Sequence, residues 1–130
     1  MSRFQANGLE WGIGLHEPDP EGWMRAHVLV RVPGFEGGFD CGIELREWGE
    51  LIKALERLEG SVGSAASESW ATMEANIELE FSLMQTGHVK GQYVFRSSSE
   101  GPALAGSFQA DQTYLPQWID HARRALPRLR

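Results

Sequence analysis

The chain has 130 residues, 42% of them hydrophobic and 23% charged, a composition that excludes a disordered or fibrous protein and suits one globular domain. Its only cysteine, Cys41, excludes an internal disulfide, and no stretch is apolar for long enough to be a secretory signal or a bilayer span. The net charge of -6 would repel a phosphate backbone and so argues against a nucleic-acid partner, and we expect a cytoplasmic protein.

The first half of the chain shows the alternation of apolar and polar residues that is typical of half-buried strands. The alternating segments are 9–15, 24–32 and 39–45, with a turn at 17–22, a break at Pro33-Gly34 and a glycine pair at Gly37-Gly38. The period then changes to 3.6 between Arg46 and Glu59, which predicts an amphipathic helix. We expect Gly60 to end this helix in the left-handed conformation.

The second half repeats this order after a small, polar connection. Three alternating segments, 72–83, 89–96 and 104–110, are followed by a helical stripe over 115–126, with Pro116 in the first turn of that helix. Between the first two segments, Gln85-Thr86-Gly87 fits a three-residue hairpin loop with Gly87 in the left-handed position. That register places Glu80 opposite Gln92 and leaves Lys90 and Arg96 near the acidic residues on the outer side of the preceding strand.

Both halves therefore read strand, strand, strand, helix. We predict an α+β fold with a roughly six-stranded antiparallel sheet, two helices packed on one of its faces and the other face exposed to solvent. The whole chain, 1–130, is expected to form a single domain, with units at about 8–59 and 70–127 and a linker at about 60–69.

No residue pattern predicts catalysis, a cofactor or a metal site, so we expect a protein that is not an enzyme. Cys41 alternates with the core residues of its strand and lacks an adjacent base. His16, His27 and His88 fall on the outer sheet face without the spacing of metal ligands, and the glycines lack the strand-glycine-helix context of a phosphate loop.

The candidate partner-binding residues lie on the expected outer face. Glu74, Glu78 and Glu80 alternate along one predicted strand and form an acidic row, with Arg96 beside it. A flat, solvated face would not separate the pKa values of two carboxylates as an acid/base pair requires, so this row suits docking onto a cationic partner. Trp23 and Trp70 stand where strands begin, either as partly exposed anchors or as caps over the core edge. The acidic turn from Glu17 to Glu21 is a further candidate.

Several short motifs resemble the WapI family of bacterial immunity proteins. They are Trp70-Ala71-Thr72-Met73-Glu74, Gly87-His88-Val89, Asp111-Gln112-Thr113-Tyr114-Leu115-Pro116 and, in the first half, Glu44-Leu45-Arg46-Glu47-Trp48. The resemblance implies a small protein that binds and neutralises the toxic C-terminal domain of a contact-delivered polymorphic toxin, often a nuclease acting on RNA. An acidic inhibitor would complement such a nuclease where the nuclease is basic.

Three functions remain open at this point. The first is a non-catalytic immunity protein, monomeric or homodimeric, that binds a cognate toxin domain such as a basic nuclease. The alternative is a housekeeping interaction or homodimerising domain of unknown partner, which would pair through its sheet face or an edge strand. The third is an enzyme or small-ligand binder with a pocket between sheet and helices.

Overall fold

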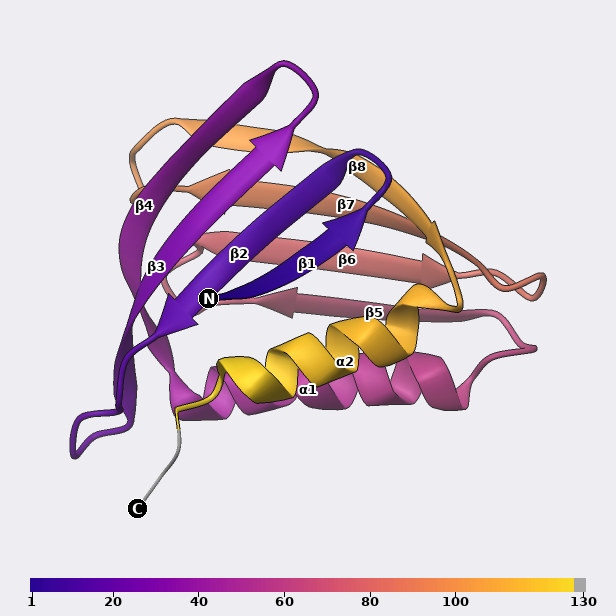
Figure 1. Ribbon diagram of the computed structural model, residues 1–130, viewed down its shortest axis with the longest axis horizontal. Coiled ribbons are helices and arrows are strands. Elements are labelled where there is room, and N and C mark those ends of the chain that lie inside the picture. Colours follow the sequence, from indigo (N-terminus) through magenta and orange to yellow (C-terminus); the bar gives the residue numbers. More distant parts are fainter. Residues whose placement is uncertain (128–130) are drawn as a thin grey trace.

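The computed structural model describes residues 1–127, which form two four-stranded antiparallel sheets and two helices (Figure 1). In chain order the elements are β1 (Ser2–Ala6), β2 (Leu9–Leu15), β3 (Trp23–Val32), β4 (Phe35–Glu44), α1 (Leu45–Gly60), β5 (Ala66–Ala71), β6 (Ile77–Leu83), β7 (His88–Arg96), β8 (Ala103–Asp111) and α2 (Tyr114–Ala125). Strands β1 to β4 make the first sheet and β5 to β8 the second, each in sequence order. The predicted domain extends to residue 130, and its last three residues lie outside the described part.

The two sheets bury their apolar faces against each other and share one hydrophobic core with the helices. The rings of Trp11 in β2 and Phe95 in β7, for example, lie 5.7 Å apart across this core. Both helices run along one side, where α1 lies next to β5 and α2 next to β1 (Figure 1). The predicted α+β class and both helices are confirmed, whereas the single six-stranded sheet is wrong. Each sheet has one apolar face as predicted, but the other sheet covers most of it.

Two edge strands, β1 and β5, were not predicted from the sequence. In β1 only Phe4 is fully buried, and β5, which falls largely in the predicted linker 60–69, consists of small and polar residues around Trp70. Neither segment shows the clean alternation of apolar and polar residues, because each strand has only one buried apolar residue, Phe4 in β1 and Trp70 in β5. The predicted strand 72–83 also begins later, at Ile77, since residues 72–76 form the turn between β5 and β6.

Predictions for single turns and glycines are partly confirmed and partly wrong. Gly87 has a φ of 91° and Glu80 pairs with Gln92, so the predicted β6–β7 hairpin is confirmed. Gly37 lies within β4 rather than before it. Gly60 is helical, and the backbone turns left-handed only at Gly63. The Ser61 hydroxyl, which donates to the Arg57 carbonyl at 2.8 Å, satisfies the end of α1 without a left-handed glycine.

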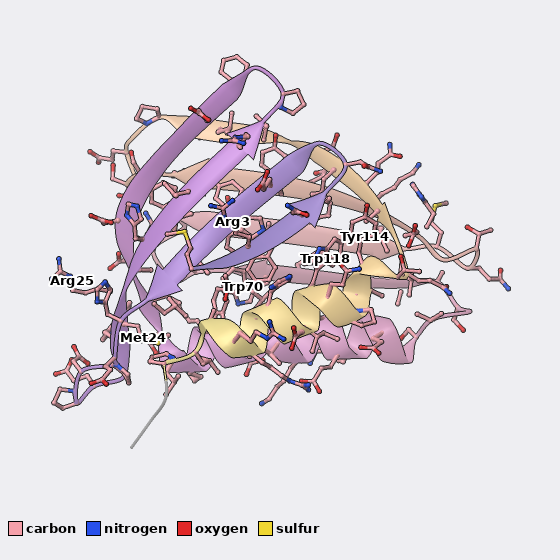
Figure 2. The ribbon with its side chains drawn as sticks, viewed as in Figure 1. Arg3, Met24, Arg25, Trp70, Tyr114 and Trp118 are labelled. Atoms are coloured by element: carbon pink, nitrogen blue, oxygen red, sulfur yellow. The ribbon has the colours of Figure 1, made fainter. Side chains whose placement is uncertain are left out.

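Three buried tryptophans fix the helices to the edge strands. The indole N–H of Trp48 in α1 donates to the Ala122 carbonyl of α2 at 2.7 Å, and that of Trp118 in α2 donates to the Gln5 carbonyl of β1 at 3.0 Å. Trp70 in β5 donates in the same way to the Glu47 carbonyl of α1 at 2.7 Å. Figure 2 shows Trp70 and Trp118 where the helices meet the strands. These bonds link β5, α1, α2 and β1 in series, and they close this side of the core.

Candidate functional site

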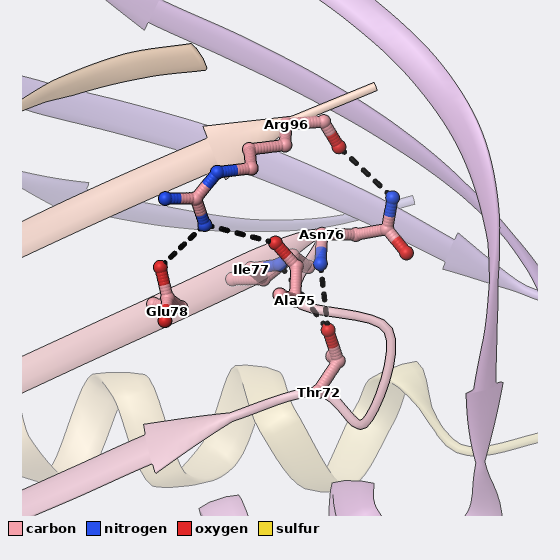
Figure 3. Close-up of polar contacts among 6 residues, drawn as sticks. All are labelled: Thr72, Ala75, Asn76, Ile77, Glu78 and Arg96. Atoms are coloured by element: carbon pink, nitrogen blue, oxygen red, sulfur yellow. Dashed lines mark hydrogen bonds and ion pairs between the residues drawn. The ribbon is translucent and has the colours of Figure 1, made fainter. Parts of the chain in front are cut away.

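The turn between β5 and β6 is tied to β7 by a dense set of polar contacts (Figure 3). The Thr72 hydroxyl oxygen accepts the backbone N–H groups of Asn76 at 3.0 Å and Ile77 at 3.2 Å. The Asn76 side-chain amide donates to the Arg96 carbonyl at 2.9 Å, and the Arg96 guanidinium donates to the Ala75 carbonyl at 3.3 Å. Because both strands contribute partners, the turn is held in one conformation.

A buried carboxylate holds the same turn from the side of the helix. Glu47, in the first turn of α1, is only 8% exposed, and its side chain accepts the backbone N–H of Met73 at 2.5 Å. Its second oxygen accepts the N–H of Glu44 at 2.8 Å, so the residue also caps the helix. This role of Glu47 was not predicted, although a Glu three residues after the N-cap residue, here Glu44, is the sequence signal for it.

The three predicted carboxylates do not form one row. Glu74 lies at the exposed tip of the β5–β6 turn, while Glu78 and Glu80 lie on the outer face of β6. Glu78 is bound by Arg96, whose guanidinium nitrogen is 2.6 Å from the carboxylate oxygen. The predicted proximity of Arg96 to the row is therefore confirmed, but the ion pair offsets the charge of Glu78. Glu74 and Glu80 have no cationic side chain within 4.0 Å among residues 1–127.

Small residues make up most of the surface around Glu80. The outer face of the second sheet carries exposed side chains at Ser67, Ser69, Ala71, Ser82, Ala103, Ala105 and Ser107. Two shallow hollows of about 540 and 320 Å³ lie there, and both are bordered by Glu80, Gln92 and Ser107. Lys90 borders the second hollow together with Glu80, so its predicted position near the carboxylates of this face is confirmed.

The two candidate tryptophans differ in exposure. Trp23 is half-buried at the start of β3, and its ring lies over Gly42 of β4, where an added Cβ would be 3.4 Å from the nearest ring carbon. Trp70 is 6% exposed, and its ring lies 5.9 Å from that of Trp48 in the core. Trp70 therefore caps the core edge, the second of the two alternatives, and its side chain is not accessible to a partner.

The acidic turn before β3 lies at the same end of the molecule as the start of α1, because the Gly22 carbonyl accepts the Leu45 N–H at 2.8 Å. Asp19 organises this turn by accepting the N–H groups of Glu21 and Trp23, each at 2.9 Å. In the part of the chain that the structure describes, none of the carboxylates of Glu17, Asp19 and Glu21 has a cationic partner within 4.0 Å.

The reactive side chains are not arranged for chemistry. The pKa of the Cys41 thiol is raised from 9.0 to about 11, first by burial and then by the carboxylates of Glu74, Asp40 and Glu47, so the thiol is protonated at neutral pH. Across residues 1–127, no three His, Cys, Asp or Glu side chains gather to hold a metal ion. The cavity between the sheets and helices measures about 20 Å³ and has an apolar lining, which leaves room for about one water molecule.

Comparison with known proteins identifies the family of this chain. The family model of the immunity protein WapI-like family matches residues 9–130. The chain belongs to the WapI-like family. The match starts where β2 begins, so it leaves out β1 and covers every later strand and both helices, and the resemblance carried by the short motifs is confirmed.

No curated protein matches this WapI-like chain. Among solved structures, it is similar to a protein with unknown function from the DUF155 family of Prochlorococcus sp. NATL2A. The identity is 8%, over 88% of this chain and 98% of the other, and the TM-score is 0.36. Within residues 1–127 of the WapI-like chain, neither helix is long and apolar enough to cross a membrane.

Proposed function

We propose that this WapI-like protein binds and neutralises a cognate bacterial toxin domain, and that it does so by binding alone, without a cofactor or catalysis. The observation that carries the proposal is the match of the immunity protein family over residues 9–130. The side chains support binding as the mode of action, because the thiol is protonated and the two hollows on the outer face of the second sheet are shallow. An inhibitor of this kind works in the cytoplasm of the cell that it protects.

We place the docking surface on the outer face of β6 and β7 and on the adjoining turn, with Glu74, Glu78, Glu80 and Arg96. The turn is fixed by bonds from Thr72 and Arg96, so little conformational entropy is lost when a partner binds to it. Small side chains around Glu80 let a partner's longer side chains approach the sheet closely.

The partner that fits this surface is cationic. Glu74 and Glu80 lack ion-pair partners within the described residues, and the turn from Glu17 to Glu21 adds three more such carboxylates beside the half-buried Trp23. A chain with a net charge of -6 attracts a basic domain from a distance and orients it on approach. A nuclease that binds the phosphate backbone of RNA has the required positive cleft.

Co-expression with the toxin domain encoded immediately upstream tests the function. We expect cells that carry both proteins to survive, and titration of the purified toxin domain to reach full inhibition at a 1:1 ratio. Continued killing despite soluble expression contradicts the proposed function. Full inhibition at a small fraction of one equivalent contradicts the mode of action, because it would require this chain to act catalytically.

Reversing the charge of Glu80 tests the docking surface. We expect Glu80→Lys to lower the association rate with the toxin domain about 10-fold at low ionic strength, and less at high salt, because steering by surface charge is screened. Glu59→Lys is the matched control, since it makes the same charge change at an exposed carboxylate at the end of α1 that has no ion-pair partner among residues 1–127. Stopped-flow binding measures both variants, and equal effects would place the interface elsewhere.

A further inference from the structure

The two sheets have four edge strands, and three of them are protected against pairing with another chain. The edge of β1 is covered by α2, whose Trp118 bonds the Gln5 carbonyl, and the edge of β5 is covered by α1. The edge strand β4 carries carboxylates at Glu36, Asp40 and Glu44. Charges on an edge strand and cover by a helix are both common ways in which proteins prevent edge-to-edge association.

The fourth edge strand, β8, is protected at one end only. Asn7, in the β1–β2 turn, donates its N–H to the Gln109 carbonyl at 2.8 Å and accepts the Gln109 N–H at 2.9 Å. Because backbone groups alternate sides along an antiparallel strand, those of Ala103, Ala105 and Ser107 point outward as those of Gln109 do. No other segment of residues 1–127 pairs with β8 over residues 103–107.

The uncovered part of β8 has none of the usual defences. From Ala103 to Ala110 there is no charged residue and no proline. The residues whose backbone groups point away from the sheet are Ala103, Ala105 and Ser107, and their side chains are small and exposed. An approaching strand therefore meets the unpaired N–H and C=O groups of Ala103 and Ala105 without a charged side chain in its way. At the other end of this stretch the β1–β2 turn lies close to Ser107, whose carbonyl oxygen would be 3.2 Å from a Cβ added at Gly8.

We propose that this edge pairs with the same edge of a second copy of the chain, as an antiparallel two-fold dimer centred on Ala105. In this pairing Ala105 faces its own symmetry mate and Ala103 faces Ser107 of the partner copy, so only small neutral residues meet on the outer face. On the inner face Leu104 lies opposite the small Gly106 of the partner copy. The same operation on β4 centred on Asp40 would oppose two carboxylates, which disfavours that edge for a second copy. A second copy is the partner that fits, because this edge is complementary to itself and a two-fold interface requires such a match.

The dimer goes beyond the proposed function and does not depend on it. Pairing of the two β8 strands joins the second sheets of both copies into one continuous eight-stranded sheet. The outer faces with Glu80 then lie side by side on one surface, so that one dimer can bind two toxin domains. Failure to dimerise leaves toxin neutralisation by a monomer intact, and failure to neutralise leaves the dimer intact.

Light scattering across a concentration series is the first test. We expect the molar mass to rise from 14.5 kDa towards twice that value as the concentration increases. Ala105→Lys places two like charges opposite each other on the axis, so this variant should stay at 14.5 kDa throughout. Ser69→Lys is the control on the same face of β5, three strands away, and it should dimerise as the unmodified chain does. The proposal is overturned if the unmodified chain stays monomeric at every concentration or if the Ala105→Lys variant dimerises.

A disulfide across the axis tests the register. Directly opposed residues of a hydrogen-bonded antiparallel pair have Cα atoms about 5.5 Å apart, within the range that a disulfide spans. Ala105→Cys in a Cys41→Ala background should therefore give a covalent dimer under mild oxidation, while Ser69→Cys in that background should form no covalent dimer. The absence of a cross-link at Ala105 overturns the proposal. A cross-link that forms only to a cysteine-bearing toxin domain also overturns it, since the toxin would then be the partner of this edge.

Discussion

At the scale of single residues, the core of the second sheet depends on a glycine. Gly91 lies on the inner face of β7, and a Cβ added there would overlap the ring of Phe108 on β8. The ring in turn lies 5.8 Å from that of Phe81 and 6.1 Å from that of Trp118. The absence of a side chain at Gly91 therefore lets an aromatic cluster pack tightly.

This packing predicts the effect of a single methyl group. Gly91→Ala should lower the free energy of unfolding by about 3 kcal/mol, because the Phe108 ring has to move out of a filled core. Gly37→Ala is the matched control in β4, where an added Cβ meets no atom within 4 Å, and it should raise the free energy of unfolding by about 0.5 kcal/mol, because it restricts the unfolded chain. Urea unfolding measures both, and equal losses would contradict the packing argument.

Cys41 predicts a pH dependence. Because burial and nearby carboxylates raise the pKa of its thiol from 9.0 to about 11, the folded state holds this proton more tightly than the unfolded state does. The resulting stabilisation is fully present below the unfolded pKa and is lost as the pH rises through the folded pKa.

Stability should therefore fall between about pH 9 and pH 11, and it should fall less in Cys41→Ala. Denaturant unfolding at pH 8 and pH 11 gives the loss for each protein, and the difference between the two losses isolates the thiol. Parallel losses in the unmodified chain and the variant would show that Cys41 does not titrate differently in the folded state.

At the scale of the elements, the helices owe their placement to bonds between side chains and backbone. Each of three indole N–H groups donates to a carbonyl of a neighbouring element, and two of these carbonyls belong to the helices. The buried Glu47 adds a fourth connection, from α1 to the β5–β6 turn. The turn that carries Glu74 is therefore positioned by a helix as well as by its own strands.

Trp70→Phe tests this connection between β5 and α1. The change leaves the Glu47 carbonyl without its buried donor, which should cost about 2 kcal/mol of the free energy of unfolding, in addition to the smaller ring. Trp23→Phe removes the same atoms from a half-buried tryptophan and should cost less than about 1 kcal/mol. Thermal or urea unfolding compares them, and equal costs would mean that the indole bond of Trp70 contributes little.

At the scale of the whole molecule, one core joins the two halves of the chain. Its buried residues come from both sheets and both helices, and Trp48 of the first half bonds Ala122 of the second. The isolated bridge between Asn7, in the β1–β2 turn, and Gln109 of β8 also joins the two halves. We therefore propose that the chain folds as one cooperative domain, in which neither four-stranded unit is stable alone.

Cutting the chain at Gly63, in the exposed connection before β5, tests this proposal. Each fragment alone should be unfolded, because its sheet would expose the apolar face that the other half covers. Mixing the fragments should restore the circular dichroism of the intact chain, and the intact chain should unfold in one transition. Fragments that fold separately, with transitions of their own, would show two independent domains.

The sequence by itself determined the local features of this protein. Alternation along residues 24–32 and 77–83 identifies the buried side of each strand, and the loop at Gly87 sets the register of Glu80 against Gln92, because both depend on side chains close in sequence. The stripe of α1 likewise identifies its buried face. Family membership was also readable from short motifs.

Only the tertiary structure decided what lies against these faces. An apolar sheet face can be covered by a helix or by another sheet, and the choice depends on segments far apart in the chain, here β2 against β7. The same dependence explains why β1 and β5 went unrecognised, why Trp70 is buried and why Glu74 stands on a turn. Edge strands, burial and charge pairing are set by neighbours that residue periodicity does not encode.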